Sequence, residues 1–471
     1  MISNALARTV FTAIAIFSFV AQAEVRLPSI VGSNMVMQRD QPVPIWGWDE
    51  PGTEVSVTLA DTKTTAKADD SGKWIAELPA FSAGGPYEML VVGSSEVKLD
   101  NLLFGDVWFC SGQSNMEWRV SQSLNAEAEI AGADFPRIRH IKIPHRPSTK
   151  PESDVPSDGW MECQSETVAG FTGVGYFFAR HLQDALNVPI GLIGCNWGGT
   201  RIEPWTPPIG FQKVPALSDI TDKLDDYPSV NDEGAINHQS PLALYNGMVS
   251  PIVPFAIRGV IWYQGEANRH DGMLYYEKMK ALIEGWRQVW QRYDLPFHFV
   301  QLAPYRYDNS PLLLPAIWEA QVAALSVPNT GMAVTLDIGN LDDIHPKNKQ
   351  EVGRRLALSV LARNYNRTEL VYSGPLYRSM RVEGNAIRIT FDHVGGGLVA
   401  RDGEPLNWFT IAGDDKVFVE ALAEIDGDAI VISSAEVENP VAVRFAWHQE
   451  AEPNLANKDG LPASAFRTHN W

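Results

Sequence analysis

Four short polar segments of the chain carry the residue types that acyl transfer requires. They contain Ser114, a glycine-rich stretch at residues 196–200, the amide of Asn268 and the imidazole of His345. An imidazole base makes a hydroxyl nucleophilic, a carboxylate orients the imidazole, and N–H groups stabilise the developing oxyanion. We therefore expect these segments to converge on a site that cleaves an ester or a related acyl bond.

Each polar segment follows a run that is typical of a buried strand or precedes a helix. Strand-like runs occur at residues 106–110, 189–194, 259–264, 297–302 and 332–337. Helical patterns lie between or after them, at residues 174–186, 274–290, 313–325 and 349–364. This alternation predicts an α/β fold with a parallel sheet covered on both faces. Ligands bind outside the carboxyl ends of such strands, where the polar segments are expected.

Every one of these residues also has an ordinary interpretation. A serine in a turn often caps a helix, and His345-Pro346 is typical of a helix start. Gly198 and Gly199 are typical of a chain reversal, and Asn268 of a helix cap. Joint placement at successive strand ends is what favours catalysis. The motif around Ser114 reads G-Q-S-N-M and lacks the second glycine of the nucleophile elbow, which excludes the α/β-hydrolase scaffold.

The chain resembles the sialate O-acetylesterase family, a branch of the SGNH (GDSL-like) hydrolases, in the segments GDVWFCSGQSNMEW, IGLIGCNWGGTRIEPW, LYNGMVSPIVPFAIRGVIWYQGEAN, DDIHPKNKQEVGRRLAL and NKDGLPASAFRT. The resemblance covers essentially the whole chain after residue 23. It implies a flavodoxin-like α/β/α hydrolase domain of three layers with β-sandwich-like regions at both ends. It also implies the removal of O-acetyl groups from sugars.

The same resemblance implies a role for each site residue. Ser114 is the nucleophile, and its backbone N–H is one oxyanion donor. Gly199, or its neighbour Gly198, supplies a second amide, and the Asn268 side chain supplies a third. His345 is the general base. Asn268→Ala is accordingly expected to lower turnover and leave substrate binding nearly intact.

The acid that orients His345 has two candidates. SGNH hydrolases usually carry this aspartate three residues before the histidine, so the resemblance implies Asp342. In the sialate esterase branch the adjacent position often carries it, which makes Asp343 the alternative. A Ser-His dyad without an acid is a third arrangement. Five residues near the motifs are expected to contact substrate: Gln113, Trp197, Arg201, Gln264 and Glu266.

The substrate class stays open between two sugars. Residues 318–321 read Trp-Glu-Ala-Gln, where the family often has Arg-Glu-Ala-Gln, so a cation that suits a sialate is absent there. An acetylated neutral plant glycan, such as xylan or xyloglucan fragments, is therefore the alternative. Four tryptophans near the motifs are expected either to stack on sugar or to lie in the core: Trp118, Trp197, Trp205 and Trp262. A non-catalytic glycan-binding protein is the alternative of a different class.

Composition and the N-terminal segment predict the binding partners and the cellular location of the protein. With 471 residues and a formal net charge of −19, the chain is a poor partner for nucleic acid or anionic membranes. Residues 1–23 read as a secretory signal, and no later run is long enough to span a membrane, so we expect a periplasmic or secreted protein. Three cysteines permit at most one disulfide, and no spacing indicates a metal or cofactor.

Strand-like and helical patterns divide the rest of the chain into three parts. We expect an N-terminal β-rich domain at residues 24–101, the hydrolase domain at 102–366 and a C-terminal β-rich domain at 367–471. Within the last, an Asp426-Gly427-Asp428 turn predicts a hairpin. The sequence predicts no particular oligomeric state.

Overall fold

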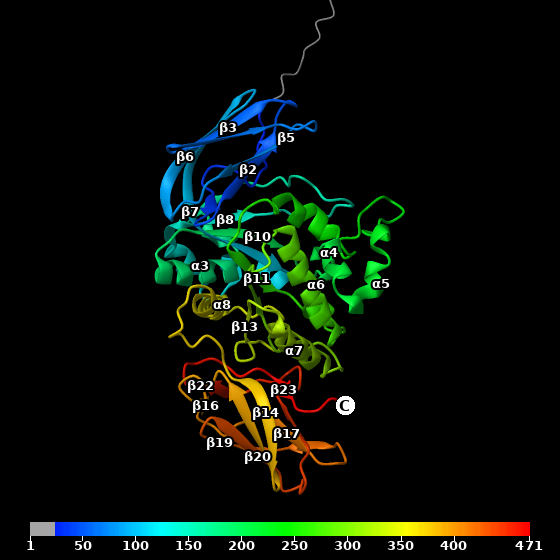
Figure 1. Ribbon diagram of the computed structural model, residues 1–471. Coiled ribbons are helices and arrows are strands. Elements are labelled where there is room, and N and C mark those ends of the chain that lie inside the picture. The colour runs from blue at the N-terminus through cyan, green and yellow to red at the C-terminus, as the bar shows by residue number, and fades with distance from the viewer. Residues whose placement is uncertain (1–23) are drawn as a thin grey trace, which may run out of the picture.

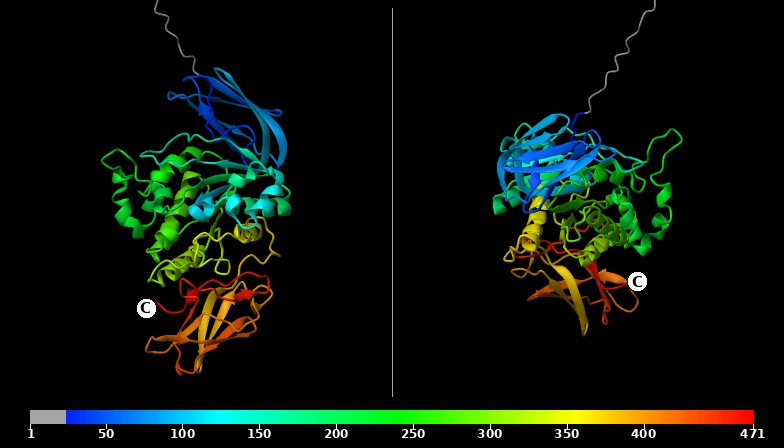
Figure 2. Two further views of the ribbon diagram at one scale, coloured as in Figure 1. Left: turned by 180° about the vertical axis from the view of Figure 1, so that it is seen from behind. Right: turned by 45° about the horizontal axis from the view of Figure 1, so that its top comes forward.

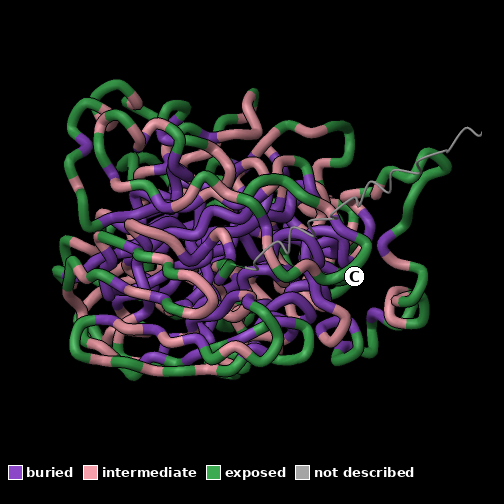
Figure 3. Tube along the Cα trace, turned by 90° about the horizontal axis from the view of Figure 1, so that it is seen from above, coloured by how far each residue is buried: buried purple, intermediate pink, exposed green. Residues whose placement is uncertain are grey.

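The computed structural model describes residues 24–471, and the predicted secretory signal at residues 1–23 lies outside the described residues. N-terminal strands, a central sheet flanked by helices, and C-terminal strands follow one another along the long axis (Figures 1 and 2). Buried residues fill the interior, and exposed ones gather in the peripheral loops (Figure 3). Among residues 24–471, no helix has the length and apolar character needed to cross a membrane. Cys110, Cys163 and Cys195 are buried free thiols.

The predicted parallel sheet is confirmed, and the molecule is a mixed α/β protein. The sheet has the order β13-β12-β11-β7-β10-β8-β9, parallel throughout except for the last pair. Its strands are β7 (Glu96–Gly112), β8 (Asp134–Lys142), β9 (Met161–Gln164), β10 (Ile190–Asn196), β11 (Gly259–Tyr263), β12 (Phe297–Val300) and β13 (Thr330–Ala333). Strand β8 escaped prediction because Arg139 and His140 interrupt its apolar pattern, although both are buried.

Helices cover both faces of this sheet. The long ones are α3 (Gly173–Leu186), α6 (Leu274–Val289), α7 (Leu313–Ala323) and α8 (Lys349–Asn364), close to the predicted ranges. Trp108 of β7 packs against Phe178 of α3, and the next residue, Phe109, packs against Trp286 of α6. Successive strand residues point to opposite faces, so α3 and α6 lie on opposite sides of the sheet. The short helices are α1 (Ser114–Glu117), α2 (Ala126–Ala131), α4 (Pro208–Gln212) and α5 (Ser218–Thr221).

Strand β7 links the N-terminal strands to the central sheet. Its first part pairs with β6 and β1, and from Asp106 onward it pairs with β10. The boundary predicted between residues 101 and 102 therefore falls inside one continuous strand. The N-terminal strands are β1 (Val36–Gln38), β2 (Val43–Trp48), β3 (Glu54–Leu59), β4 (Thr62–Lys67), β5 (Lys73–Leu78) and β6 (Gly84–Val92).

The C-terminal strands form antiparallel sheets of order β14-β15-β20-β19, β18-β17-β21-β23 and β16-β22. The hairpin predicted at the Asp-Gly-Asp turn is confirmed, because Asp426 of β19 pairs with Ala429 of β20. The strands are β14 (Leu376–Glu383), β15 (Ala386–Asp392), β16 (Leu398–Ala400), β17 (Phe409–Ala412), β18 (Phe418–Glu420), β19 (Leu422–Asp426), β20 (Ala429–Ser433), β21 (Ala442–Phe445), β22 (Leu455–Asn457) and β23 (Phe466–Arg467).

Candidate active site

The carboxyl ends of the three central strands meet at Gly112. This residue is the register partner of Asn196 in β10 and of Tyr263 in β11, so the loops after the three strands start side by side. Gly112 has a φ of +137°, and a Cβ there would come within 2.1 Å of the Tyr263 carbonyl oxygen. Only glycine fits this close approach directly before the serine loop.

Ser114 and His345 meet at this edge of the sheet although 231 positions separate them. The Ser114 hydroxyl lies 2.9 Å from His345 Nε2, within hydrogen-bond distance. Ser114 is the first residue of α1, and His345 lies in the loop between β13 and α8. Both line a surface cavity of about 610 Å³. The imidazole is therefore positioned to accept the serine proton beside a space that admits a ligand.

The two aspartates before His345 point in different directions. Asp343 Oδ1 accepts the backbone N–H of His345 at 2.9 Å and lies 3.5 Å from His345 Nδ1. Asp342 instead pairs with Arg306 at 2.8 Å, and its side chain is 82% exposed. The structure thus brings Asp343 to the imidazole and turns away Asp342, which the spacing had favoured. In the turn between them, the Asn340 side chain accepts the N–H of Asp342 and the Asn340 carbonyl accepts the N–H of Asp343. This turn separates the two carboxylates.

Burial and a nearby positive charge favour the neutral form of the His345 imidazole. Burial and the nearby Lys349 ammonium lower the pKa of His345 below its ordinary value of 6.5, and Asp343 acts in the opposite direction. Lys349 is fully buried, and burial lowers its own pKa to about 7. The Trp118 ring stacks on the imidazole with centroids 4.6 Å apart. A neutral imidazole is the form that accepts a proton from a hydroxyl.

These charges predict a pH profile. We expect kcat/KM for an ester to fall as the pH decreases through the pKa of His345, with the midpoint below pH 6.5, because protonated imidazole is no base. Lys349→Met removes a positive charge, so the pKa of His345 rises and the acid limb moves to higher pH. Lys347→Met, at the exposed neighbouring lysine, should leave the limb in place. A limb that moves to lower pH in Lys349→Met would contradict this electrostatic account.

Asn115 ties three loops together beneath the pair. Its Nδ2 donates to Glu266 Oε1 at 2.6 Å and to the Ile344 carbonyl at 3.0 Å. Its Oδ1 accepts from Lys349 Nζ at 2.5 Å. Residues adjacent to Ser114 and His345 are thereby held to each other. Sequence reasoning missed Asn115 and Lys349 in this role, although both lie inside the motifs that it singled out.

The glycine loop after β10 lies directly against the serine. A Cβ on Gly198 would come within 3.3 Å of the Ser114 Cβ. The Gly198 N–H donates to Glu117 Oε2 at 2.7 Å, so it is not free to bind an oxyanion. The backbone N–H groups of Ser114 and Gly199 have no acceptor within residues 24–471. They are the amides available to a ligand at this point.

Glu117 anchors this glycine loop. Its Oε1 lies 3.1 Å from Lys142 Nζ and 2.8 Å from His145 Nε2. Burial opposes ionisation, but these two partners lower the pKa of Glu117 to about 2. The carboxylate therefore stays charged over the whole neutral range and keeps its hydrogen bond to the Gly198 amide.

Asn268 is not a free donor in this structure. Its fully buried side chain donates from Nδ2 to Glu203 Oε2 at 3.0 Å and to Asp271 Oδ2 at 2.7 Å. Its Oδ1 accepts from the Ile202 N–H and from Gln264 Nε2. Both amide hydrogens are thus committed to carboxylates, and the expectation that Asn268 faces the oxyanion does not match this geometry.

This placement changes what Asn268→Ala should do. The buried carboxylate of Glu203 and the partly buried one of Asp271 each lose a hydrogen-bond donor, so we expect the free energy of unfolding to fall by about 1–3 kcal/mol, measured by denaturant titration. The kcat of the folded variant should change by less than about tenfold. A variant of unchanged stability whose kcat falls about 100-fold or more would restore the oxyanion role.

Four of the five residues expected to contact substrate already bind other groups of the protein. Gln113, Gln264 and Glu266 are buried, with hydrogen bonds to neighbouring loops. Arg201 pairs with Glu203 at 2.9 Å and with Asp271 at 3.1 Å, so its charge is compensated. The sequence pattern predicted that these residues lie at strand ends, but it did not predict the direction of their side chains.

Two of the four tryptophans near the motifs are core residues, and two are half-exposed. Trp205 and Trp262 are fully buried. The Trp197 ring stacks on the rings of His145 and His238, with centroids 4.3 and 4.7 Å apart. Trp118 lines the Ser114–His345 cavity together with Glu117, Arg119, Ser121 and Gln122. Arg119 is exposed at this cavity and was not anticipated from the sequence.

Comparisons with known proteins agree with this geometry. The family model described as carbohydrate esterase, sialic acid-specific acetylesterase matches residues 104–362. Human sialate O-acetylesterase is 34% identical over 74% of this chain and 73% of its own length, and the mouse protein is 32% identical over 78% and 79%. A carbohydrate acetylesterase from Xanthomonas citri superposes with a TM-score of 0.87 at 38% identity, covering 95% of this chain and 100% of that one.

Proposed function

Because the chain belongs to the sialic acid-specific acetylesterase family of carbohydrate esterases, it is a carboxylic ester hydrolase, and we propose that it cleaves O-acetyl groups from sugars with Ser114 as nucleophile. The observation that carries this proposal is the 2.9 Å contact between Ser114 Oγ and His345 Nε2 at the wall of an open cavity. A hydroxyl and an imidazole in this geometry suffice for nucleophilic attack on an ester carbonyl.

The reaction proceeds in two steps. His345 Nε2 takes the proton of Ser114 as Oγ attacks the acetyl carbonyl, and Asp343 stabilises the imidazolium that forms. The tetrahedral oxyanion accepts hydrogen bonds from the backbone N–H groups of Ser114 and Gly199. His345 returns the proton to the departing sugar oxygen, and the C–O bond to the sugar breaks.

Water completes the cycle. His345 takes a proton from a water molecule that attacks the acetyl-serine, and the same amides hold the second oxyanion. The imidazolium then protonates Ser114 Oγ as acetate leaves. The Trp118 ring stacked on the imidazole shields one face of His345 and keeps the ring oriented through both steps.

The remaining family features are part of the same proposal. Helices on both faces of a parallel sheet support the three-layer SGNH arrangement for residues 102–366, with β-sandwich-like regions before and after it. Residues 1–23 direct export to the periplasm or beyond. A fusion of residues 1–23 to a reporter, with export measured by fractionation, tests whether this segment directs export.

Two observations bear on the sugar. Arg119 is exposed at the cavity and forms no ion pair among residues 24–471, which favours a carboxylate-bearing sugar such as an O-acetylated sialate. Trp318 is fully buried, with its Nε1–H bonded to the Leu302 carbonyl, so no cation is presented from that position. This second observation favours neutral glycans, which we keep as the alternative.

Acetate release separates the two substrates. We expect mass spectrometry to detect acetate from O-acetylated sialosides faster than from acetylated xylan or xyloglucan oligomers. Arg119→Gln should raise KM about tenfold for the sialoside, since a charge-assisted hydrogen bond is lost, and leave KM for the neutral esters unchanged. Faster release from the neutral oligomers, unaffected by Arg119→Gln, would support the alternative. No acetate from any saccharide would contradict the proposed function.

A further inference from the structure

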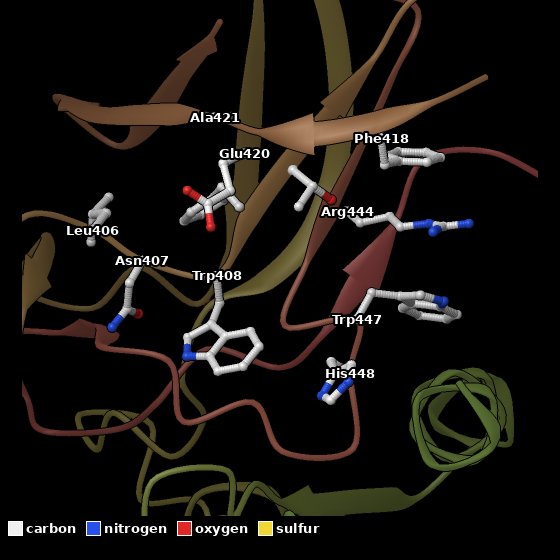
Figure 4. Close-up of a pocket in the computed structure, with 11 residues that line it drawn as sticks. Leu406, Asn407, Trp408, Phe418, Glu420, Ala421, Arg444, Trp447 and His448 are labelled. Carbon is white, nitrogen blue, oxygen red and sulfur yellow. The ribbon is translucent and has the colours of Figure 1, made fainter. Parts of the chain in front are cut away.

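A second cavity, of about 590 Å³, lies in the C-terminal strands and is lined only by residues between 406 and 448. Its walls come from β17, β18, β21 and the segments that flank them (Figure 4). The lining combines aromatic rings with a few charged and polar side chains. Such a mixture is typical of sites that bind small ligands through apolar contact and a few oriented hydrogen bonds.

Aromatic side chains form one side of this cavity. Trp408, His448 and Trp447 follow one another along it in Figure 4. Trp408 is 39% exposed and has a φ of +63°, a left-handed conformation that bulky residues rarely adopt. The fold therefore holds a large apolar ring toward solvent at a cost in both conformation and hydration. Strain of this kind is concentrated at ligand sites.

Charged and polar groups form the opposite side. Thr410 of β17 is the register partner of Glu420 in β18 and of Arg444 in β21, so carboxylate, hydroxyl and guanidinium lie in one row across the sheet. Strands are about 4.8 Å apart, so the backbones of Glu420 and Arg444 are about 10 Å apart. Within residues 24–471 neither charge belongs to an ion pair, and Arg444 rests on the Phe418 ring at 3.9 Å.

We propose that this cavity binds a neutral pyranose ring of a saccharide chain. The C–H face of a pyranose stacks on an aromatic ring such as Trp408. Its hydroxyls both donate and accept, which matches an acceptor at Glu420 and a donor at Arg444 on opposite sides of Thr410. The charges of Glu420 and Arg444 are equal and opposite, so together they give the row no net charge, which favours a ring that carries none.

The segment after the cavity continues to the catalytic loop. Gln449 exchanges backbone hydrogen bonds with Tyr305 and Pro311, and Glu450 lies 3.3 Å from Arg306. Arg306 in turn pairs with Asp342, next to Asp343. We therefore assign the bound ring to the same glycan chain that carries the acetyl group, an assignment that rests on the proposed function. Binding itself does not depend on it.

Calorimetry on the full-length Ser114→Ala protein tests the binding. The probes are cellohexaose and xylohexaose as neutral chains and sialyllactose as an acidic one, all without acetyl groups. We expect at least one neutral chain to bind, with Trp408→Ala weakening its Kd about tenfold or more and Glu420→Gln weakening it severalfold. Tyr293→Ala, at a 66% exposed aromatic outside both cavities, is the matched control and should bind as its parent does.

The outcomes separate this inference from the proposed function. Turnover of p-nitrophenyl acetate by Trp408→Ala in the otherwise native chain should equal that of the native chain, and its melting temperature should match that of Tyr293→Ala. Binding without acetate release from any saccharide would overturn the proposed substrate and leave the cavity assignment intact. Absence of binding by both neutral chains, equal binding by Trp408→Ala, or preference for sialyllactose would overturn the assignment.

Discussion

Replacing Ser114 with alanine is expected to lower kcat for an acetyl ester by about 10⁴-fold or more, because the nucleophile and the covalent step are lost together. His345→Ala should cause a loss of similar size. The double variant should be no slower than either single one, since the two residues act as a unit. The assay is release of p-nitrophenol from p-nitrophenyl acetate by each purified variant.

Ser121→Ala is the matched control, because Ser121 lines the same cavity without contacting the imidazole. It should keep kcat within about threefold of the native value, as surface substitutions usually have small effects. Equal melting temperatures of all four variants would exclude unfolding as the cause. A Ser114→Ala protein that keeps native turnover would show that another residue is the nucleophile, and would contradict the role of Ser114.

The neighbouring aspartates supply the second large effect. Asp343→Asn should lower kcat by about 10²–10⁴-fold, because the group 3.5 Å from His345 Nδ1 no longer stabilises the imidazolium. Asp342→Asn should change kcat by less than about twofold, since it breaks only an exposed pair with Arg306. Both variants remove one charge from adjacent positions, so each controls for the other.

The ratio of the two kcat values decides between three arrangements. A large loss confined to Asp343→Asn supports the triad drawn from the geometry. A large loss confined to Asp342→Asn would restore the acid that the spacing favours. Little loss in either would make Ser114 and His345 a dyad whose imidazole is oriented by its surroundings, chiefly the stacked Trp118 ring.

The sequence predicted the sheet well because its strands are buried on both faces. Runs such as residues 106–110 and 259–264 are almost wholly apolar, and every residue of β11 is buried. Strand β8 was missed because buried Arg139 donates to the carbonyls of Asn34 and Pro136, contacts that sequence patterns do not express. Sequence patterns predict a strand that is held by burial of apolar side chains. They do not predict a strand that is held by a network of polar side chains.

The candidate site divides in the same way. Ser114 and His345 were found because strand ends of a parallel sheet share one edge. Their proximity follows from topology, which the sequence expresses. The direction of a side chain from such a loop depends on local partners. Asn340 decides which aspartate faces His345, and Glu203 with Asp271 decides that Asn268 points inward.

Trapping the acyl-enzyme tests the central claim most directly. The native protein is mixed with p-nitrophenyl acetate, quenched with acid within the first turnovers, and digested for peptide mass spectrometry. We predict one acetyl group on the peptide that contains Ser114, absent from Ser114→Ala and from His345→Ala, and lost from the native protein with time as water completes the reaction. An acetyl group on another residue, or turnover that persists in Ser114→Ala, would contradict the account.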